Sequence, residues 1–292
     1  MPCQNLTLLF FLSALIGGCA AGDRSVGLSA IGSLEAPMVI DHACTDIDQI
    51  PEEWILKARE TIGVAYGLND LGVRLLQGLE QLELKDALYD IDRTGRGDAL
   101  AVFTKDLRGD LGTPDRYRWV DRTRFLLEKG WGDVNVVMWC WGDQLTRYTP
   151  EEVEFYLEQM QALEAEFPGV AMVYATAPLD GEGSSGNTHL RNEQIRAYCR
   201  SYNKILFDVA DIERFDPDGK DYLDREGDFG GYYREGGSIR NWAGQWCDAN
   251  PGNCTPYPCR RSKPLICDRN AQAFWWMMAR LAGWKPPGAS GS

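Results

Sequence analysis

Histidine is scarce in this chain, which has only two, His42 and His189, among 292 residues. The segment 64–78 reads as a short strand, a tight turn and the start of a helix, which is where α/β hydrolytic enzymes place their nucleophile. The turn at residues 67–72 contains no Ser, Cys or His, so the usual nucleophile and base are absent from it. The sequence therefore indicates a fold more clearly than a reaction.

Phosphate-binding motifs are also missing. No Gly-Lys-Ser/Thr loop occurs and no Gly-x-Gly-x-x-Gly directly follows a predicted strand, so we expect no cofactor. Lys and Arg number 30 against 43 Asp and Glu, and the net charge of −13 repels phosphate backbones. We therefore expect no nucleic-acid partner, whereas a cationic or neutral partner, such as a polysaccharide or a small molecule, fits the charge. Residues 216–219 lack EF-hand spacing and are expected to form an ordinary turn, not a metal site.

A predominantly apolar stretch lies at the N-terminus, where residues 6–18 are too short to span a membrane and indicate a signal peptide over 1–18. The stretch ends in a sequence that resembles a bacterial lipobox, with Cys19 as the lipidated residue and 19–36 as a flexible tether. Plain secretion with cleavage near Ala20 or Ala21 is the alternative. We predict an exported protein of the periplasm or cell surface, an outer-membrane lipoprotein that meets the membrane only through its lipid anchor.

Seven cysteines follow Cys19, and four of them fall in the Cys-rich loop segment 247–267. Export permits disulfides, and a segment with little core benefits from covalent closure. A zinc site is the alternative, but paired Cys-x-x-Cys spacing and a nearby His are missing. Cys140 ends a hydrophobic run and is expected to be the unpaired thiol. The disulfide candidates are Cys44, Cys199, Cys247, Cys254, Cys259 and Cys267.

Apolar runs alternate with helical patterns along the chain. Strands are predicted at residues 37–40, 62–66, 99–103, 134–139, 170–174 and 205–209, and helices at 71–84, 114–129, 149–167, 190–203 and 271–282. Thr113 and Pro114 mark the start of one helix, and Thr149, Pro150 and Glu152 that of another. This alternation predicts a parallel sheet covered on both faces, with ligands bound at the carboxyl ends of its strands.

The chain resembles an uncharacterised family of exported bacterial proteins related to SGNH (GDSL-like) hydrolases. The segments that carry the resemblance are residues 40–46, 65–67, 109–116, 133–139, 179–181, 191–196, 206–208, 217–219, 275–276 and 279–284. The resemblance implies a three-layer α/β/α flavodoxin-like sandwich over residues 37–285, followed by a flexible tail over 286–292. It also implies an ancestral activity in ester hydrolysis, on acyl groups such as those of carbohydrates.

The chain departs from the family at the positions that carry the chemistry. The family's first turn reads His-Thr-Ser-His-Gly-Ser-Gln, and here Asp70 or Val73 stands where a Ser is expected. The family's Gly-His in the loop after the predicted strand 170–174 is Ala177-Pro178 here, and its His before the last helix is Arg261. Gly112 and Gln144 remain as candidate oxyanion donors. Without a nucleophile and base, Ser–His hydrolysis should be lost.

Three functions remain open. The first is an esterase-like protein that has lost its Ser–His machinery. The second is a non-catalytic glycan-binding or envelope-interaction module on the same fold, and the third is altered chemistry at Asp70. At this position the more usual role of an Asp is to cap the helix that follows. Polar residues of the expected pocket, and the aromatic and imidazole side chains near it, are the candidate ligand contacts: Asn69, Arg74, Asp143, Arg261, Trp141 and His189. Trp141, Trp242 and Trp246 could stack on sugar rings or belong to the core. His42 is expected to make a structural hydrogen bond, and the sequence leaves the oligomeric state open.

Overall fold

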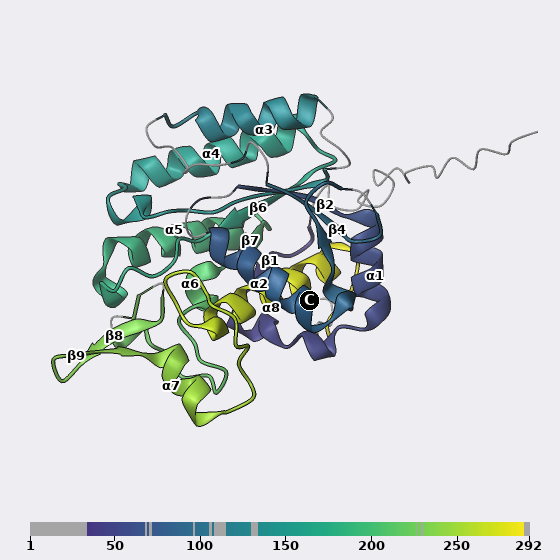
Figure 1. Ribbon diagram of the computed structural model, residues 1–292. Helices are drawn as coiled ribbons and strands as arrows, with labels where there is room; N and C mark the ends of the chain where they lie inside the picture. The colour runs from purple at the N-terminus through teal and green to yellow at the C-terminus, as the bar shows by residue number, and fades with distance from the viewer. Residues whose placement is uncertain are drawn as a thin grey trace, which may run out of the picture.

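The computed structural model describes residues 34–288, apart from positions 68, 70–71, 96, 105–106, 108–114, 130–133, 226 and 229. A seven-stranded, wholly parallel sheet runs through the molecule with helices on both faces (Figure 1), which confirms the predicted three-layer α/β fold. In sheet order the strands are β1 (Met38–Ile40), β7 (Ile205–Phe207), β6 (Ala171–Ala175), β5 (Val136–Trp139), β2 (Gly63–Gly67), β4 (Leu100–Phe103) and β3 (Ile91–Asp92).

The middle five strands follow the flavodoxin-like order, because the first strand of the set lies between the second and the third. The short strands β3 and β1 extend this core at its two edges. Alternate strand residues point to opposite faces, so Val136 and Met138 join one hydrophobic cluster and Val137 and Trp139 the other. Strand β5 is therefore apolar on both sides.

The helices form two layers. One face is covered by α1 (Glu52–Thr61), α2 (Gly72–Lys85) and α8 (Pro264–Leu281), and the other by α3 (Arg118–Glu128), α4 (Pro150–Glu166) and α5 (Asn187–Ser201) (Figure 1). The capping box predicted for α4 is present, with Thr149 accepting from the Glu152 backbone and Glu152 accepting from that of Thr149. The predicted start of α3, at Thr113 and Pro114, lies outside the described residues.

A small module follows the last strand of the sheet. The short helix α6 (Val209–Ile212) leads to an antiparallel hairpin, β8 (Tyr232–Glu235) and β9 (Ser238–Asn241), and then to α7 (Trp242–Ala249). In Figure 1 the hairpin and α7 project from the lower left of the sandwich. Disulfides join Cys247 to Cys254 and Cys259 to Cys267, as the Cys-rich segment predicted.

Within the described part of the chain three cysteines are free and buried, which corrects part of the disulfide prediction. Cys140 is free as expected, but Cys44 and Cys199 are free as well. Cys44 packs in the cluster beneath α8, and Cys199 packs in the cluster on the opposite face of the sheet. A bond of about 2 Å between sulfurs cannot cross the sheet, so these two cannot pair.

The predicted signal peptide, the predicted lipidation site Cys19 and most of the predicted tether lie outside the described residues. Among the described helices, none has the length and apolar character needed to cross a bilayer. The two disulfides are compatible with an exported protein.

Candidate functional site

Asn69 fixes the turn that follows β2. Its Oδ1 accepts from the Gly72 backbone N–H at 2.6 Å, at the start of α2, and its Nδ2 donates to the Cys140 carbonyl at 2.8 Å, just past β5. The residue is 5% exposed, so its side chain holds two strand ends together and is not presented to a ligand. Asp70 and Gly112, a candidate nucleophile and a candidate oxyanion donor, lie outside the described residues.

Arg74 projects from the first turn of α2 into a buried ion pair with Glu213, which follows β7. The guanidinium lies 3.2 Å from a Glu213 carboxylate oxygen, and both side chains are 2% exposed. Asn270 of α8 donates to the same carboxylate at 3.0 Å. Burial raises the pKa of Glu213 to about 7, although Arg74 and the Asn270 hydrogen bond act in the opposite direction. The pair joins three elements at the carboxyl edge of the sheet.

The space beside this ion pair is small. A cavity of about 20 Å³ is lined by Arg74, Glu213, Tyr66, Cys140 and Thr176, among others, and has room for about one water molecule. The Tyr66 hydroxyl lies 2.9 Å from the Cys140 sulfur, and burial raises the pKa of that thiol to about 12. Cys140 is therefore protonated and unreactive at neutral pH.

The loop after β5 places its candidate residues in different environments. Trp141 is 1% exposed and donates to the Ala175 carbonyl at 2.9 Å, so its ring belongs to the core and offers no face to a sugar. Gln144 is 2% exposed and accepts from the Gly142 N–H at 2.7 Å. Its Nε2 has no hydrogen-bond partner among the described residues, which leaves a donor at the position expected for an oxyanion contact. Asp143 is exposed beside it.

The remaining candidates are spread over the C-terminal half of the chain. Arg261 is exposed with a left-handed backbone (φ 54°), between the Cys259–Cys267 disulfide partners. Trp242 is 1% exposed and stacks on Tyr222, while Trp246 donates to Asp218 at 2.8 Å. These tryptophans therefore do not line up with Trp141 as a stacking platform.

His189 lies in the first turn of α5 and is partly buried. Burial lowers the pKa of its imidazole below 6.5, and Glu193 opposes this shift while Arg196 adds to it. The preceding residues 181–186 match Gly-x-Gly-x-x-Gly, but Thr176–Asp180 separates them from β6 and they form a 3₁₀ turn, so the strand-to-helix turn of a nucleotide site is not formed.

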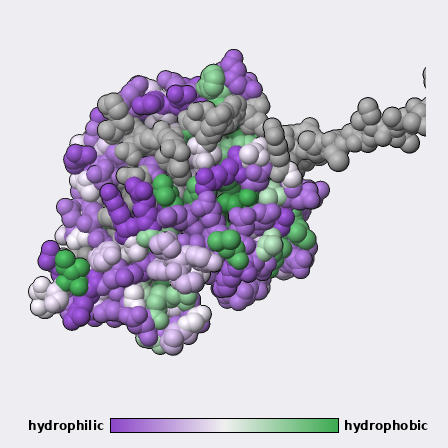
Figure 2. Space-filling model, in the orientation of Figure 1, coloured by the Kyte–Doolittle hydropathy of each residue, from purple (hydrophilic) through white to green (hydrophobic). Residues whose placement is uncertain are grey.

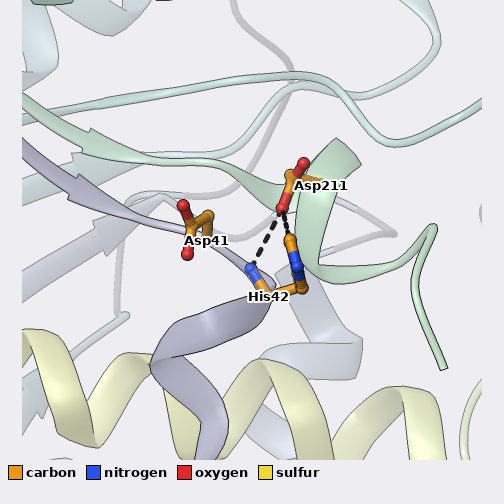
Figure 3. A group of neighbouring side chains, drawn as sticks. All are labelled: Asp41, His42 and Asp211. Atoms are coloured by element: carbon orange, nitrogen blue, oxygen red, sulfur yellow. Dashed lines mark hydrogen bonds and ion pairs between the residues drawn. The ribbon is translucent and has the colours of Figure 1, made fainter. Parts of the chain in front are cut away.

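His42 follows β1, which is the edge strand of the sheet on the side away from β3. Its Nδ1 contacts Asp211 Oδ1, and its backbone N–H donates to the same oxygen at 3.1 Å (Figure 3). Its ring stacks on that of Phe215, with 3.8 Å between the ring centroids. The expected hydrogen bond of His42 is thus present. Burial raises the pKa of the neighbouring Asp41 carboxyl, and repulsion from Asp211 adds to this shift.

Sequence reasoning did not find Asp211 or Glu213 as site residues. Their partners His42 and Arg74 lie 169 and 139 residues away along the chain, so no local spacing connects them. The one available signal was position, because both residues fall in the loop 208–218 that follows a predicted strand.

A larger groove lies on the C-terminal module, between β9, α7 and the start of α8. It has a volume of about 430 Å³ and is lined by polar and charged side chains on either side of the Cys247–Cys254 disulfide: Arg240, Asn241, Gln245, Asp248, Thr255 and Lys263. Figure 2 shows one face of the molecule, on which hydrophilic surface predominates and apolar residues are scattered.

Comparisons with protein-family models and with curated proteins find no match to this chain.

Proposed function

We propose that this protein is an exported SGNH-hydrolase-like protein that no longer hydrolyses esters by Ser–His chemistry and instead binds a carbohydrate ligand. The observation that carries the proposal is the placement of His42. It follows β1, which lies four strands from β2, and strands about 4.8 Å apart put the two strand ends roughly 19 Å apart. A base must lie within hydrogen-bond reach of its nucleophile, so His42 cannot serve the turn after β2.

The second histidine does not supply the base either. His189 lies on α5, and its charged neighbours are Glu193 and Arg196 of the same helix, together with Asp180 and Arg214. The helix follows β6, two strands from β2. The chain has no third histidine. Any remaining hydrolysis would depend on the carboxylate of Asp70.

The groove on the C-terminal module supports the binding half of the proposal. Its volume of about 430 Å³ falls within the usual range of ligand sites, roughly 300–1,000 Å³. Arg240 and Lys263 supply donors, Asp248 supplies acceptors, and amide and hydroxyl side chains supply both. This mixture suits an uncharged ligand with many hydroxyl groups, and the Cys247–Cys254 disulfide in its lining limits the ordering cost of binding.

Two measurements on the full purified chain test the proposal. Hydrolysis of p-nitrophenyl acetate and of acetylated xylan should not exceed that of an Asp70→Ala variant. Turnover that Asp70→Ala abolishes would show a carboxylate-based enzyme and overturn the proposal.

Binding of xylan oligosaccharides, followed by calorimetry, should weaken in Arg240→Ala and Asp248→Ala, two exposed residues of the groove. Arg200→Ala, an exposed change on α5, is the matched control and should bind as the wild type does. Binding that is lost equally in all three variants would place the ligand elsewhere.

A further inference from the structure

Asp41, His42 and Asp211 form a group of potential metal ligands at the free edge of the sheet. One ligand atom from each of the three side chains lies within 4.8 Å of the other two. The first two residues follow β1 and the third lies in α6, after β7, so adjacent strands bring the group together (Figure 3). We propose that this group binds a first-row divalent cation of the Zn²⁺ type.

The donor set selects the class of cation. An imidazole nitrogen suits zinc and its first-row neighbours, whereas calcium and magnesium prefer sites made of oxygen alone. Ligand atoms on a tetrahedral zinc ion lie about 3.3 Å apart, given bonds of about 2.0–2.1 Å. The most widely separated donor atoms must therefore approach by no more than about 1.5 Å, which rotation of the partly exposed Asp41 side chain can supply. The His42 and Asp211 donor atoms, which are in direct contact, must move apart to admit the ion.

Charge favours a cation here. Two carboxylates face one imidazole, and among the described residues no Lys or Arg forms an ion pair with Asp41 or Asp211. The Arg269 guanidinium of α8 is near enough to interact electrostatically with Asp211, so it balances part of this negative charge. In the structure, His42 Nδ1 contacts Asp211 Oδ1, and a cation bound by both atoms would take the place of the proton between them. The ion would thereby offset the repulsion between the two carboxylates.

His42 is held in place by contacts that do not use its ring nitrogens. Phe215 stacks on the His42 ring and fixes its plane. Arg269 of α8 donates to the His42 carbonyl at 3.3 Å and to the Ile212 carbonyl at 3.4 Å, which ties the loop after β1 to the end of α6. Such outer contacts are typical of metal sites, where they orient the ligands.

The site is open on one side. The His42 side chain is 35% exposed and that of Asp211 is 18% exposed, so an ion can enter from solvent and water can complete its coordination. Three protein ligands with a remaining open position is the arrangement of catalytic rather than closed structural zinc sites. This site is separate from the groove and from the turn after β2, so its test does not depend on the proposed function.

Calorimetry of the full chain, prepared without a histidine tag, tests the proposal directly. Zn²⁺ should bind with one equivalent per chain, and more tightly than Ca²⁺ or Mg²⁺. His42→Gln, Asp211→Asn and Asp41→Asn should each weaken Zn²⁺ binding by at least about tenfold, as loss of even an outer-shell contact often does. His189→Gln, which removes the only other histidine, is the matched control and should bind as the wild type does.

Co²⁺ provides a second readout. Its absorption spectrum should show d–d bands without a thiolate charge-transfer band, because the donor set contains no sulfur. Absence of Zn²⁺ binding, a thiolate band, or Zn²⁺ binding that survives all three ligand variants would overturn the proposal. Should His42→Gln fail to fold, Asp41→Asn decides the outcome, because the Asn oxygen can still accept the Ala43 N–H that Asp41 accepts.

Discussion

The Arg74 guanidinium and the Glu213 carboxylate, 3.2 Å apart, form an ion pair in which both side chains are 2% exposed. The pair bridges α2 and the segment after β7, with Asn270 of α8 completing it. Arg74, which was expected to contact a ligand, thus instead joins α2 to the segment after β7 inside the protein.

Removing one member of this pair should destabilise the protein strongly. Glu213→Gln leaves the Arg74 charge buried without its ion-pair partner, and we expect the free energy of unfolding to fall by about 3–5 kcal/mol. The double variant Arg74→Met/Glu213→Gln should recover part of that loss. Urea unfolding measures both, with Glu235→Gln of the exposed Arg225–Glu235 pair as the control that costs less than about 1 kcal/mol.

Asn69→Ala should cost roughly 1–3 kcal/mol of unfolding free energy, because it removes the acceptor for the Gly72 N–H and the donor to the Cys140 carbonyl. Asn69→Asp keeps the acceptor and places a carboxylate against that carbonyl, so it should also destabilise. Urea unfolding of the two variants beside the wild type checks both effects. A wild-type value for Asn69→Ala would contradict the role assigned to this residue.

The cysteines should separate into two chemical groups. Peptide mapping by mass spectrometry should recover Cys247 linked to Cys254 and Cys259 linked to Cys267. Cys44, Cys140 and Cys199 should resist iodoacetamide in the folded protein, because they are buried and burial raises the pKa of their thiols. Alkylation of the three in denaturant, but not before, is the expected result. Rapid labelling of Cys44 or Cys199 in native buffer would contradict their burial.

His189 should make stability depend on pH. Burial holds the pKa of its imidazole below 6.5 in the folded chain, so the unfolded chain binds a proton more readily. The contribution of His189 is therefore fully present above pH 6.5 and is lost as the pH falls below it. Thermal unfolding between about pH 8 and pH 5 should show a smaller loss in His189→Gln than in the wild type. NMR titration would measure the pKa of His189 directly, because the chain has only two histidines whose signals must be told apart.

Strong local signals in the sequence predicted most of the sheet and its helices. The apolar run before Cys140 became β5, and Thr149 with Glu152 formed the predicted capping box. Helix α1 was missed because only Ile55 and Ala58 on it are buried, which leaves little periodic pattern. Helix α8 begins at Pro264 instead of 271, since Arg269 and Asn270 are polar but buried against partners from distant segments.

The site was harder to predict because its contacts are long-range. Nothing near Arg74 in the sequence points to Glu213, and nothing near His42 points to Asp211. Trp141 was placed correctly after a strand, but whether it faces solvent depends on Tyr148 and Tyr156, against which its ring packs. Which side chains meet at the edge of a parallel sheet is decided by the order of its strands, and that order is a property of the whole chain.

Strand β1 opens the described chain yet pairs with β7 through only three residue pairs, at the outer edge of the sheet. Mechanical tension on the segment before residue 34 would therefore act on the short pairing of β1 with β7 before any other part of the sheet. The interstrand hydrogen bonds there run across the direction of pull, so they would be loaded together, in shear. A cation held by Asp41, His42 and Asp211 would cross-link the residues after β1 to α6, which follows β7. Removal of that cation should lower the force at which β1 detaches from the sheet.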